Sequence, residues 1–220
     1  MILHSKAFIF DLNGTMIDDM SYHIQAWHQI LNYFGASLSY EEVKDQCYGK
    51  NDELLERIFP GKFSSKEMKN ISIEKERRYQ AEYKPRMKLI SGLDRLLEDS
   101  HSNNIKMAIG SAAIRFNIDF VLDGLNIRNY FSSIVSADDV TKSKPDPETY
   151  LKCAEELQVL PKDCIVFEDS PKGVEAAANA NMKAVVITTM SDEKEFTQYD
   201  NILGFVNNYN RLGIKSPIYL

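Results

Sequence analysis

The sequence of 220 residues has few cysteines, no excess of positive charge and no long hydrophobic run. Its three cysteines, Cys47, Cys153 and Cys164, fit no metal-ligand spacing, so we expect reduced, buried thiols and a cytoplasmic protein. The net charge of −6 argues against a nucleic-acid partner, which needs a basic face. No apolar run approaches the roughly 18 residues of a membrane span, so we expect no membrane association. Because few residues precede the first apolar segment, we expect no signal peptide.

The organisation of the chain follows from where helical and strand patterns occur. Residues 1–18 contain one apolar strand, residues 19–85 show only helical spacing, and residues 86–220 alternate between strands and helices. Strands separated by helices form a parallel sheet with right-handed crossovers. We therefore expect an α/β protein with a Rossmann-like parallel-sheet core, residues 1–18 and 86–220, and an inserted all-helical cap, residues 19–85. We expect the protein to be a monomer.

The expected elements can be given by residue number. After a first strand at 6–10, the core strands are expected at 105–109, 133–135, 164–167, 184–187 and 203–206. The core helices are expected at 92–102, 114–125, 147–157 and 171–180. In the cap, the segment 65–83 is long and charged, which indicates a mostly solvated helix.

The first chemically informative segment is 8–15, Phe-Ile-Phe-Asp-Leu-Asn-Gly-Thr. An apolar strand ends there in Asp11, and a glycine-containing turn follows. Open α/β sheets keep their chemistry at this carboxyl edge. Taken alone, Asp11 could equally be a residue that caps the next element.

Three later segments strengthen the functional interpretation. Ser111 follows a strand, Lys144 precedes a proline, and Glu168 and Asp169 close another strand. Each alone has a structural explanation: a turn, a solvated loop residue and helix N-capping, respectively. In this order, the segments resemble the haloacid dehalogenase superfamily. Phosphoryl transfer needs a nucleophile, for which Asp11 is the candidate, and groups that neutralise phosphate oxygens, for which Ser111 and Lys144 are candidates.

A metal is expected as well. Glu168 and Asp169 supply the hard oxygen ligands that Mg²⁺ prefers. The resemblance further implies that Asp11 and the backbone carbonyl of residue 13 bind the metal, with Asp169 as the surest acidic ligand. The resemblance also implies that catalysis passes through an aspartyl phosphate.

Position 13 departs from the phosphatase pattern of this superfamily, because it is Asn13 where those members carry a second Asp. That Asp protonates the leaving oxygen and later activates the attacking water. An amide has no titratable proton near neutral pH. Three explanations stay open: an engineered variant, a natural enzyme whose leaving group needs no proton, or the recruitment of another acid.

The cap resembles the β-phosphoglucomutase-like branch of the superfamily. The match lies in Tyr22-His23 and Ala26-Trp27 and in the segment 48–51, Tyr-Gly-Lys-Asn. It implies that His23 contacts position 13 or replaces its acid, and that Lys50 binds substrate.

The loop after the second core strand differs from the mutase pattern. The flanking residues Gly110 and Ala112 are expected to line the phosphate site. Only Arg115 could hold a second phosphate there, so phosphatase activity is favoured over mutase activity.

We therefore expect a Mg²⁺-dependent phosphatase of a small phosphorylated metabolite, such as a sugar phosphate. The alternatives are a β-phosphoglucomutase-like phosphomutase and a protein that binds phosphate without turnover.

Overall fold

The computed structural model describes residues 1–214, and its central element is a sheet of six parallel strands in the order β4-β3-β2-β5-β6-β7. Each strand and core helix begins and ends within one residue of its expected bounds, so the expected α/β class is confirmed. The strands are β2 (Ala7–Phe10), β3 (Lys106–Gly110), β4 (Ser133–Val135), β5 (Cys164–Glu168), β6 (Lys183–Ile187) and β7 (Ile202–Val206). The core α-helices are α5 (Leu93–Ser102), α6 (Arg115–Gly124), α7 (Glu148–Leu157) and α8 (Pro171–Asn179).

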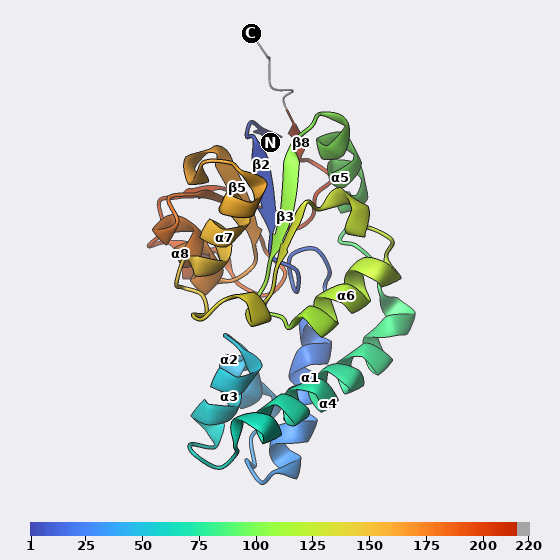
Figure 1. Ribbon diagram of the computed structural model, residues 1–220, viewed down its shortest axis with the longest axis vertical. Helices are drawn as coiled ribbons and strands as arrows, with labels where there is room; N and C mark the ends of the chain where they lie inside the picture. The colour runs from blue at the N-terminus through green and yellow to red at the C-terminus, as the bar shows by residue number, and fades with distance from the viewer. Residues whose placement is uncertain (215–220) are drawn as a thin grey trace. The chain divides into compact units, whose positions relative to one another are not determined.

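The two central strands, β2 and β5, are continuous apolar runs in the sequence because they are buried in the middle of the sheet. All four residues of β2 are fully buried, and β5 is buried along its length. Strands covered on both faces show continuous hydrophobic runs rather than alternation. Figure 1 shows α7 and α8 on one side of the sheet and α5 on the other, so both faces are covered.

Two short strands were not expected from the sequence. β1 (Ile2–Leu3) pairs in parallel with β8 (Gly213–Ile214) in a separate two-stranded sheet. Strands of two residues are too short to show a periodicity, so the sequence pattern contained no signal for them.

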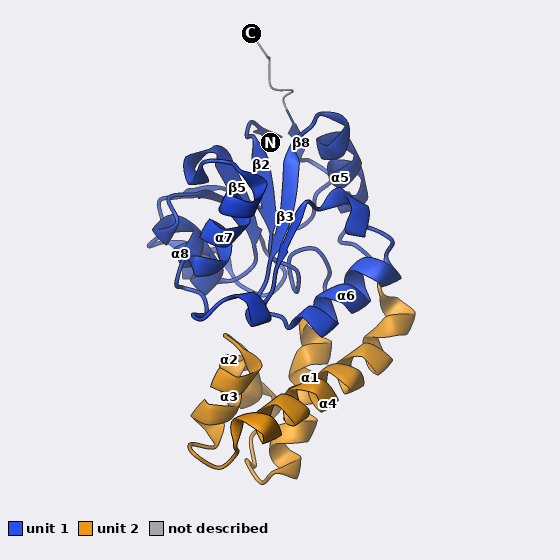
Figure 2. Ribbon diagram, viewed as in Figure 1, with its two compact units in different colours: residues 1–18, 88–220 blue, residues 19–87 orange. Residues whose placement is uncertain are grey.

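The chain divides into two compact units, which Figure 2 distinguishes by colour. The first contains Met1–Asp18 and the chain from Lys88 onward, and the second is Asp19–Met87. The second unit consists of the helices α1 (Met20–Tyr33), α2 (Tyr40–Gln46), α3 (Asn51–Ile58) and α4 (Ser65–Tyr83), followed by the short 3₁₀ helix Lys84–Arg86. The boundary after the helices lies two residues beyond the expected one.

Most residues of α4 are exposed or half-buried, as expected, but the helix also has a buried face. Its buried residues are Ile71, Ser72, Lys75, Glu76, Tyr79 and Tyr83. Residues three and four positions apart recur among them, which is the spacing of one helical face. The sequence pattern did not reveal this buried face, because Lys75 and Glu76, which belong to it, are charged.

A buried polar cluster joins α4 to α1 and α3. Lys75 Nζ donates to His23 Nδ1 and lies 3.0 Å from Glu76 Oε1. Asn51 Nδ2 donates to the same Glu76 oxygen at 3.1 Å. The Lys75 and Glu76 side chains are each only 3% exposed. Burial raises the pKa of Glu76, but the charge of Lys75 and these hydrogen bonds outweigh it and hold the pKa below its usual value.

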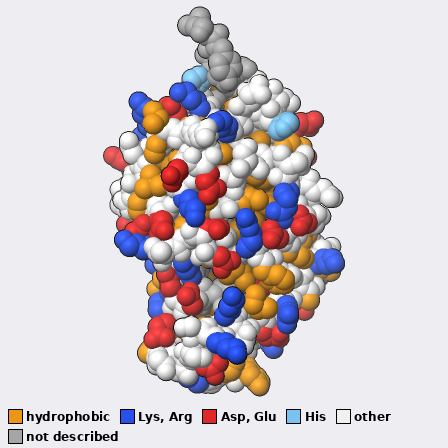
Figure 3. All heavy atoms as spheres, viewed as in Figure 1, with side chains coloured by type: hydrophobic (Ala, Val, Ile, Leu, Met, Phe, Trp, Pro, Cys, Tyr) orange, Lys and Arg blue, Asp and Glu red, His pale blue; other side chains and the backbone are white. Residues whose placement is uncertain are grey.

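No helix within residues 1–214 is both long enough and apolar enough to cross a membrane. On the face drawn in Figure 3, acidic and basic side chains are interspersed rather than gathered by sign.

We predict that Lys75→Ala lowers the free energy of unfolding by about 3–5 kcal/mol, because it leaves the Glu76 carboxylate buried without its cation. The control is Arg78→Ala on the same helix. Arg78 forms an ion pair with Glu74 in which the side chains are 41% and 50% exposed, and its loss should cost less than about 1 kcal/mol. Urea unfolding of both variants measures the difference. Equal losses would contradict the buried role of Lys75.

Candidate active site

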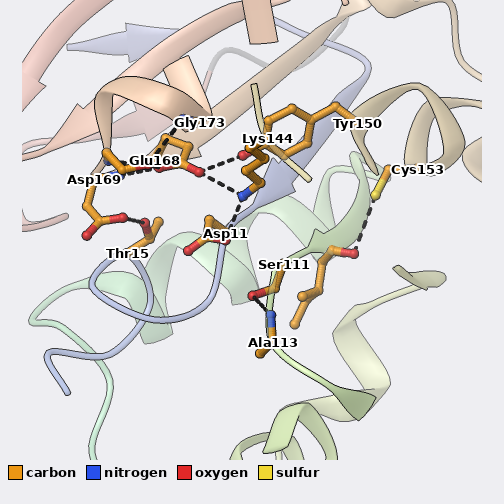
Figure 4. Close-up of polar contacts among 12 residues, drawn as sticks. Asp11, Thr15, Ser111, Ala113, Lys144, Tyr150, Cys153, Glu168, Asp169 and Gly173 are labelled. Atoms are coloured by element: carbon orange, nitrogen blue, oxygen red, sulfur yellow. Dashed lines mark hydrogen bonds and ion pairs between the residues drawn. The ribbon is translucent and has the colours of Figure 1, made fainter. Parts of the chain in front are cut away.

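Three neighbouring strands bring the expected core residues to one edge of the sheet. β2 lies between β3 and β5 and pairs with both in parallel. Asp11 follows β2, Ser111 follows β3, and Glu168 and Asp169 lie at the end of β5. Because the carboxyl ends of parallel strands share one edge, these side chains converge there, as Figure 4 shows.

Lys144 lies at the centre of this group. Its Nζ donates to Asp11 Oδ1 and to Glu168 Oε1, both at 2.7 Å (Figure 4). The Lys144 side chain is 8% exposed, so these ion pairs are largely shielded from water. Burial alone would lower the pKa of Lys144, but the two carboxylates outweigh it and raise the pKa above its ordinary value. Lys144 is therefore a fixed positive charge beside Asp11.

Glu168 holds Lys144 in place. Its Oε1 also accepts from the Tyr150 hydroxyl at 2.8 Å, and its Oε2 accepts from the backbone nitrogens of Asp169 at 2.8 Å and Ser170 at 2.9 Å. A Cβ atom at position 173 would overlap the Glu168 carboxylate, so only Gly173 fits. Burial raises the pKa of Glu168, but Lys144 and these hydrogen bonds hold it below its usual value. With both oxygens engaged, Glu168 is placed as the anchor of Lys144 rather than as a metal ligand.

Asp169 faces the loop that follows Asp11. Its Oδ1 accepts from the Thr15 hydroxyl at 3.2 Å. Gly14 has a φ of +75°, and a Cβ there would overlap the Asp169 carboxylate. Tyr209 fixes the same loop by donating to the Thr15 carbonyl at 2.8 Å. Burial, followed by repulsion from Glu168 and Asp11, raises the pKa of Asp169 well above its usual value.

The charge balance at this edge fits a divalent cation. Three carboxylates, those of Asp11, Glu168 and Asp169, share one ammonium group, that of Lys144. Within residues 1–214, no group of three His, Cys, Asp or Glu side chains could hold a metal. Asp11 and Asp169 are therefore the two side chains available, together with backbone carbonyls of the turn after Asp11. One or two carboxylates completed by water are what Mg²⁺ uses.

Asn13 lies in this turn, two residues after Asp11. Its backbone forms an isolated parallel bridge with Ile17, and the Gly14 nitrogen donates to the Ile17 carbonyl at 2.8 Å. The Thr189 hydroxyl donates to the Gly14 carbonyl. The turn therefore has a fixed backbone whatever the side chain at position 13. The amide of Asn13 can hydrogen-bond but cannot transfer a proton.

Ser111 is 2% exposed, and its Oγ accepts a hydrogen bond from the Ala113 nitrogen at 3.2 Å. Because Oγ is the acceptor in this bond, the hydroxyl hydrogen can be donated to a phosphate oxygen. The neighbouring Gly110 is closely packed: a Cβ there would lie 3.0 Å from Cys153 Sγ. Ala112, which follows Ser111, has no polar side chain to contribute. Gly110 therefore acts through packing, and Ser111 supplies the donor.

Arg115 lies at the start of α6, but its side chain is engaged elsewhere. Nη1 donates to the Ile134 carbonyl at 3.1 Å, and the backbone nitrogen donates to Asp138 Oδ2 at 2.8 Å. The structure therefore gives no support to the expected role of Arg115 in holding a second phosphate.

In the helical unit, His23 has partners on both ring nitrogens. Nδ1 accepts from Lys75, and Nε2 lies 3.2 Å from Asp19 Oδ2. Since the ammonium of Lys75 donates to Nδ1, the ring hydrogen is assigned to Nε2, where it faces Asp19. The imidazole also stacks on Tyr79, with 3.8 Å between ring centroids. This geometry favours a structural role for His23 over that of a replacement acid.

Lys50 lies at the end of the loop between α2 and α3, and Arg57 stabilises the conformation of this loop. Arg57 Nη2 donates to the carbonyls of Gln46 at 2.8 Å and Tyr48 at 2.9 Å, and the guanidinium lies 3.9 Å from the Tyr48 ring centroid. Gly49 has a φ of +76°, and the Lys50 nitrogen donates to Glu53 Oε2 at 3.0 Å. The loop that carries Lys50 is thus defined within its own unit. Its role in substrate binding stays a prediction.

Sequence reasoning missed several residues of the core site. Tyr150 lies within a helical apolar pattern and looked like ordinary packing. Thr15 was visible only as part of the turn after Asp11. The Lys144–Glu168 pair could have been inferred, because a buried carboxylate at a strand end needs a cation.

Comparison with known proteins gives one consistent family. The family model described as haloacid dehalogenase-like hydrolase matches residues 8–187. A β-phosphoglucomutase from Bacillus subtilis is 34% identical over 82% of this chain and 82% of its own length. A fructose-1-phosphate phosphatase from Escherichia coli is 28% identical over 80% of this chain and 93% of its own length. A crystal structure of a HAD hydrolase, family IA, variant 3, from Entamoeba histolytica superposes with a TM-score of 0.82. It is 28% identical and covers 93% of this chain and 94% of that chain.

Proposed function

We propose that this chain, which belongs to the haloacid dehalogenase-like hydrolase family, is a phosphatase of small phosphate monoesters, sugar phosphates among them. The observation that carries the proposal is Lys144, which bridges Asp11 and Glu168 at 2.7 Å. This contact holds the Asp11 carboxylate in one orientation and places the positive charge of Lys144 directly beside it. The names of two relatives, a fructose-1-phosphate phosphatase and a β-phosphoglucomutase, support phosphorylated sugars as the substrate class.

In the proposed reaction, a carboxylate oxygen of Asp11 attacks phosphorus and the bond from phosphorus to the sugar oxygen breaks. Asp11 then carries the phosphoryl group as an acyl phosphate. Water attacks this phosphorus, the bond to the Asp11 oxygen breaks, and inorganic phosphate leaves. Lys144 and the Ser111 hydroxyl stabilise the charge on the transferring oxygens. Overall, one ester and one water give one alcohol and one phosphate.

We propose Mg²⁺ as the cofactor, held by Asp11, Asp169 and the backbone carbonyl of Asn13. The excess of carboxylates and the raised pKa of Asp169 support this set. When bound, Mg²⁺ offsets the repulsion between the carboxylates and the phosphate oxygens. We propose that Glu168 anchors Lys144 instead of binding the metal, since its two oxygens accept four hydrogen bonds from Lys144, Tyr150 and the following backbone.

Asn13 restricts which esters react well. A sugar alkoxide needs a proton as it leaves, and an amide cannot supply one. A phenolate or a carboxylate leaves without one. The nucleophile and its cation are intact, so the first step should proceed with acidic leaving groups. The second step lacks a general base at position 13, so the phosphorylated enzyme should persist.

A phosphomutase is the second candidate, since a relative with 34% identity bears that name. A mutase must hold a sugar with two phosphates. The engagement of Arg115 with the Ile134 carbonyl weighs against it.

The three cysteines are free thiols, which supports action in the cytoplasm.

We predict that Asp11→Ala abolishes hydrolysis of p-nitrophenyl phosphate, because it removes the attacking carboxylate. Lys144→Ala should lower the rate and weaken the binding of inorganic phosphate. Asp123→Ala, which removes a carboxylate at the far end of α6, serves as the control. An Asp11→Ala variant that hydrolyses at the rate of the unmodified protein would show that the nucleophile lies elsewhere.

We predict that Asp169→Ala weakens Mg²⁺ binding by at least the roughly 10–100-fold that is typical for loss of a group supporting a metal site. Titration calorimetry measures this without turnover. Asp163→Asn, which alters a surface carboxylate paired with Lys6, should bind Mg²⁺ normally. Unchanged affinity in Asp169→Ala would exclude the proposed metal site.

We predict that Asn13→Asp raises the rate with sugar phosphates by roughly 10²–10⁴, which is the usual contribution of general acid–base catalysis. Formation of the phosphorylated enzyme from p-nitrophenyl phosphate should change little, because that leaving group needs no proton. Intact mass spectrometry should detect the phosphorylated protein with Asn13 and lose it with Asp at this position. No gain on sugar phosphates would mean that another group already acts as the acid.

A further inference from the structure

The turn after β2 has carbonyl oxygens that accept hydrogen bonds from inside and outside the turn. Within it, the Leu12 carbonyl accepts from the Met16 nitrogen at 2.9 Å. From outside it, the Thr189 hydroxyl donates to the Gly14 carbonyl. Asn13, whose carbonyl is the proposed metal ligand, lies between Leu12 and Gly14. The direction of that carbonyl therefore depends on how firmly the turn is held.

Tyr209 holds the same turn from a distant part of the chain. Its hydroxyl donates to the Thr15 carbonyl at 2.8 Å, although the two residues are 194 positions apart. The Thr15 hydroxyl in turn donates to Asp169 Oδ1 at 3.2 Å, as Figure 4 shows. The Tyr209 hydroxyl therefore fixes the backbone of the residue that connects the turn to the carboxylate of a proposed metal ligand.

Tyr209 is itself held in place. Its side chain is fully buried, and its ring centroid lies 5.8 Å from that of Phe167. Phe167 belongs to β5, the strand that ends beside Asp169. The Tyr209 nitrogen donates to the Ser91 carbonyl at 2.9 Å. One side chain thus contacts both segments that carry proposed metal ligands, the turn through its hydroxyl and β5 through its ring.

The Tyr209 hydroxyl stays a hydrogen-bond donor beside these carboxylates. Burial, followed by the charges of Asp169 and Asp11, raises the pKa of Tyr209 well above its usual value. The hydroxyl therefore keeps its hydrogen at neutral pH and adds no negative charge to this edge of the sheet. A neutral donor in this position orients the turn without competing for the cation.

The family match does not include this contact. The family model covers residues 8–187, whereas Tyr209 lies between β7 and β8. The hydrogen bond from Tyr209 to Thr15 is therefore made by a segment outside the residues that define the family in this chain.

A firmly held turn matters more for one divalent cation than for another. Mg²⁺ is small and demands near-ideal octahedral geometry, whereas Ca²⁺ accepts a larger and more flexible set of oxygen ligands. A carbonyl that moves out of its place should therefore weaken the binding of Mg²⁺ more than that of Ca²⁺.

We infer that Tyr209 is a positioning residue that sets the preference of the site for Mg²⁺ over Ca²⁺ by holding the turn after Asp11. It acts through Thr15 and does not itself bind the metal. The inference rests on the proposed function, because it takes Asp11, Asp169 and the Asn13 carbonyl as the metal ligands.

The test measures the affinities of the unmodified protein and of Tyr209→Phe for Mg²⁺ and for Ca²⁺ in separate calorimetric titrations. Phenylalanine keeps the ring against Phe167 and removes only the hydroxyl. Mg²⁺ affinity should fall by roughly 10–100-fold, the usual effect of losing a group that supports a metal site. Ca²⁺ affinity should fall by less than about threefold, because Ca²⁺ tolerates a displaced ligand.

The ratio of the two affinities distinguishes positioning from a general loss of structure. Partial unfolding would weaken both ions equally, and equal losses would overturn the inference, as would unchanged Mg²⁺ affinity. Tyr199→Phe is the matched control, since it removes a tyrosine hydroxyl that donates to Glu175 at 3.3 Å. It should leave both affinities unchanged. A shift of the ratio in this control equal to that in Tyr209→Phe would also overturn the inference.

A second variant loosens the same turn at another carbonyl. Thr189→Val removes the hydroxyl that donates to Gly14, and it should shift the ratio in the same direction as Tyr209→Phe. No shift in Thr189→Val would overturn the claim that the rigidity of the turn sets the preference for Mg²⁺. Circular dichroism of each variant before the titration establishes that it is folded.

Failure of the proposed function gives a different result. In that case no phosphate ester is hydrolysed in an Asp11-dependent manner, whereas the titrations need no turnover and still measure the role of Tyr209. If the unmodified protein bound no Mg²⁺, the inference would be overturned together with the proposed cofactor.

Discussion

The ammonium group of Lys144, 2.7 Å from carboxylate oxygens of Asp11 and Glu168, organises the core site. Ion pairs this deeply buried add little net stability, because desolvation offsets their attraction. Their effect here is geometric. Glu168 is held by Tyr150 and by the backbone of the next two residues, so it fixes Lys144, and Lys144 in turn orients Asp11. The position of the candidate nucleophile thus depends on a chain of contacts across β2 and β5.

This arrangement determines which residues around it can vary. Gly173 and Gly14 sit where any Cβ would overlap the Glu168 or Asp169 carboxylate. The turn that contains Asn13 is held through backbone contacts, those of Asn13 and Gly14 with Ile17. A neutral amide there also adds no fourth carboxylate to an edge already rich in negative charge. Position 13 can therefore change the chemistry while the turn keeps its backbone.

The sequence was sufficient to predict the sheet and to place Asp11, Ser111 and Asp169 at its carboxyl edge, because each follows a buried apolar run. Lys144 was predicted beside them only through the order of the motifs. The sequence was not sufficient for the partners of these residues. Tyr150 reads as core packing, and its hydrogen bond to Glu168 depends on how α7 lies against the sheet. The buried Lys75 and Glu76 read as solvated, because charge in a helix usually marks the exposed face. Such contacts join residues far apart in the chain, and their residue types alone do not specify them.

The two buried charge clusters differ in a way that separates structure from function. In the helical unit, the two buried carboxylates have partners of their own. Asp19 accepts from the Tyr79 hydroxyl and faces His23 Nε2. Glu76 lies beside the Lys75 ammonium and accepts from Asn51. Both carboxylates of this cluster therefore accept hydrogen bonds from side chains of the same unit. In the core, Lys144 alone faces three carboxylates, and burial, followed by repulsion from Glu168 and Asp11, raises the pKa of Asp169. A buried site that lacks positive charge is stabilised by a cation from solution. The same physical rule therefore makes the first cluster a helix-packing device and the second a site suited to a divalent metal ion.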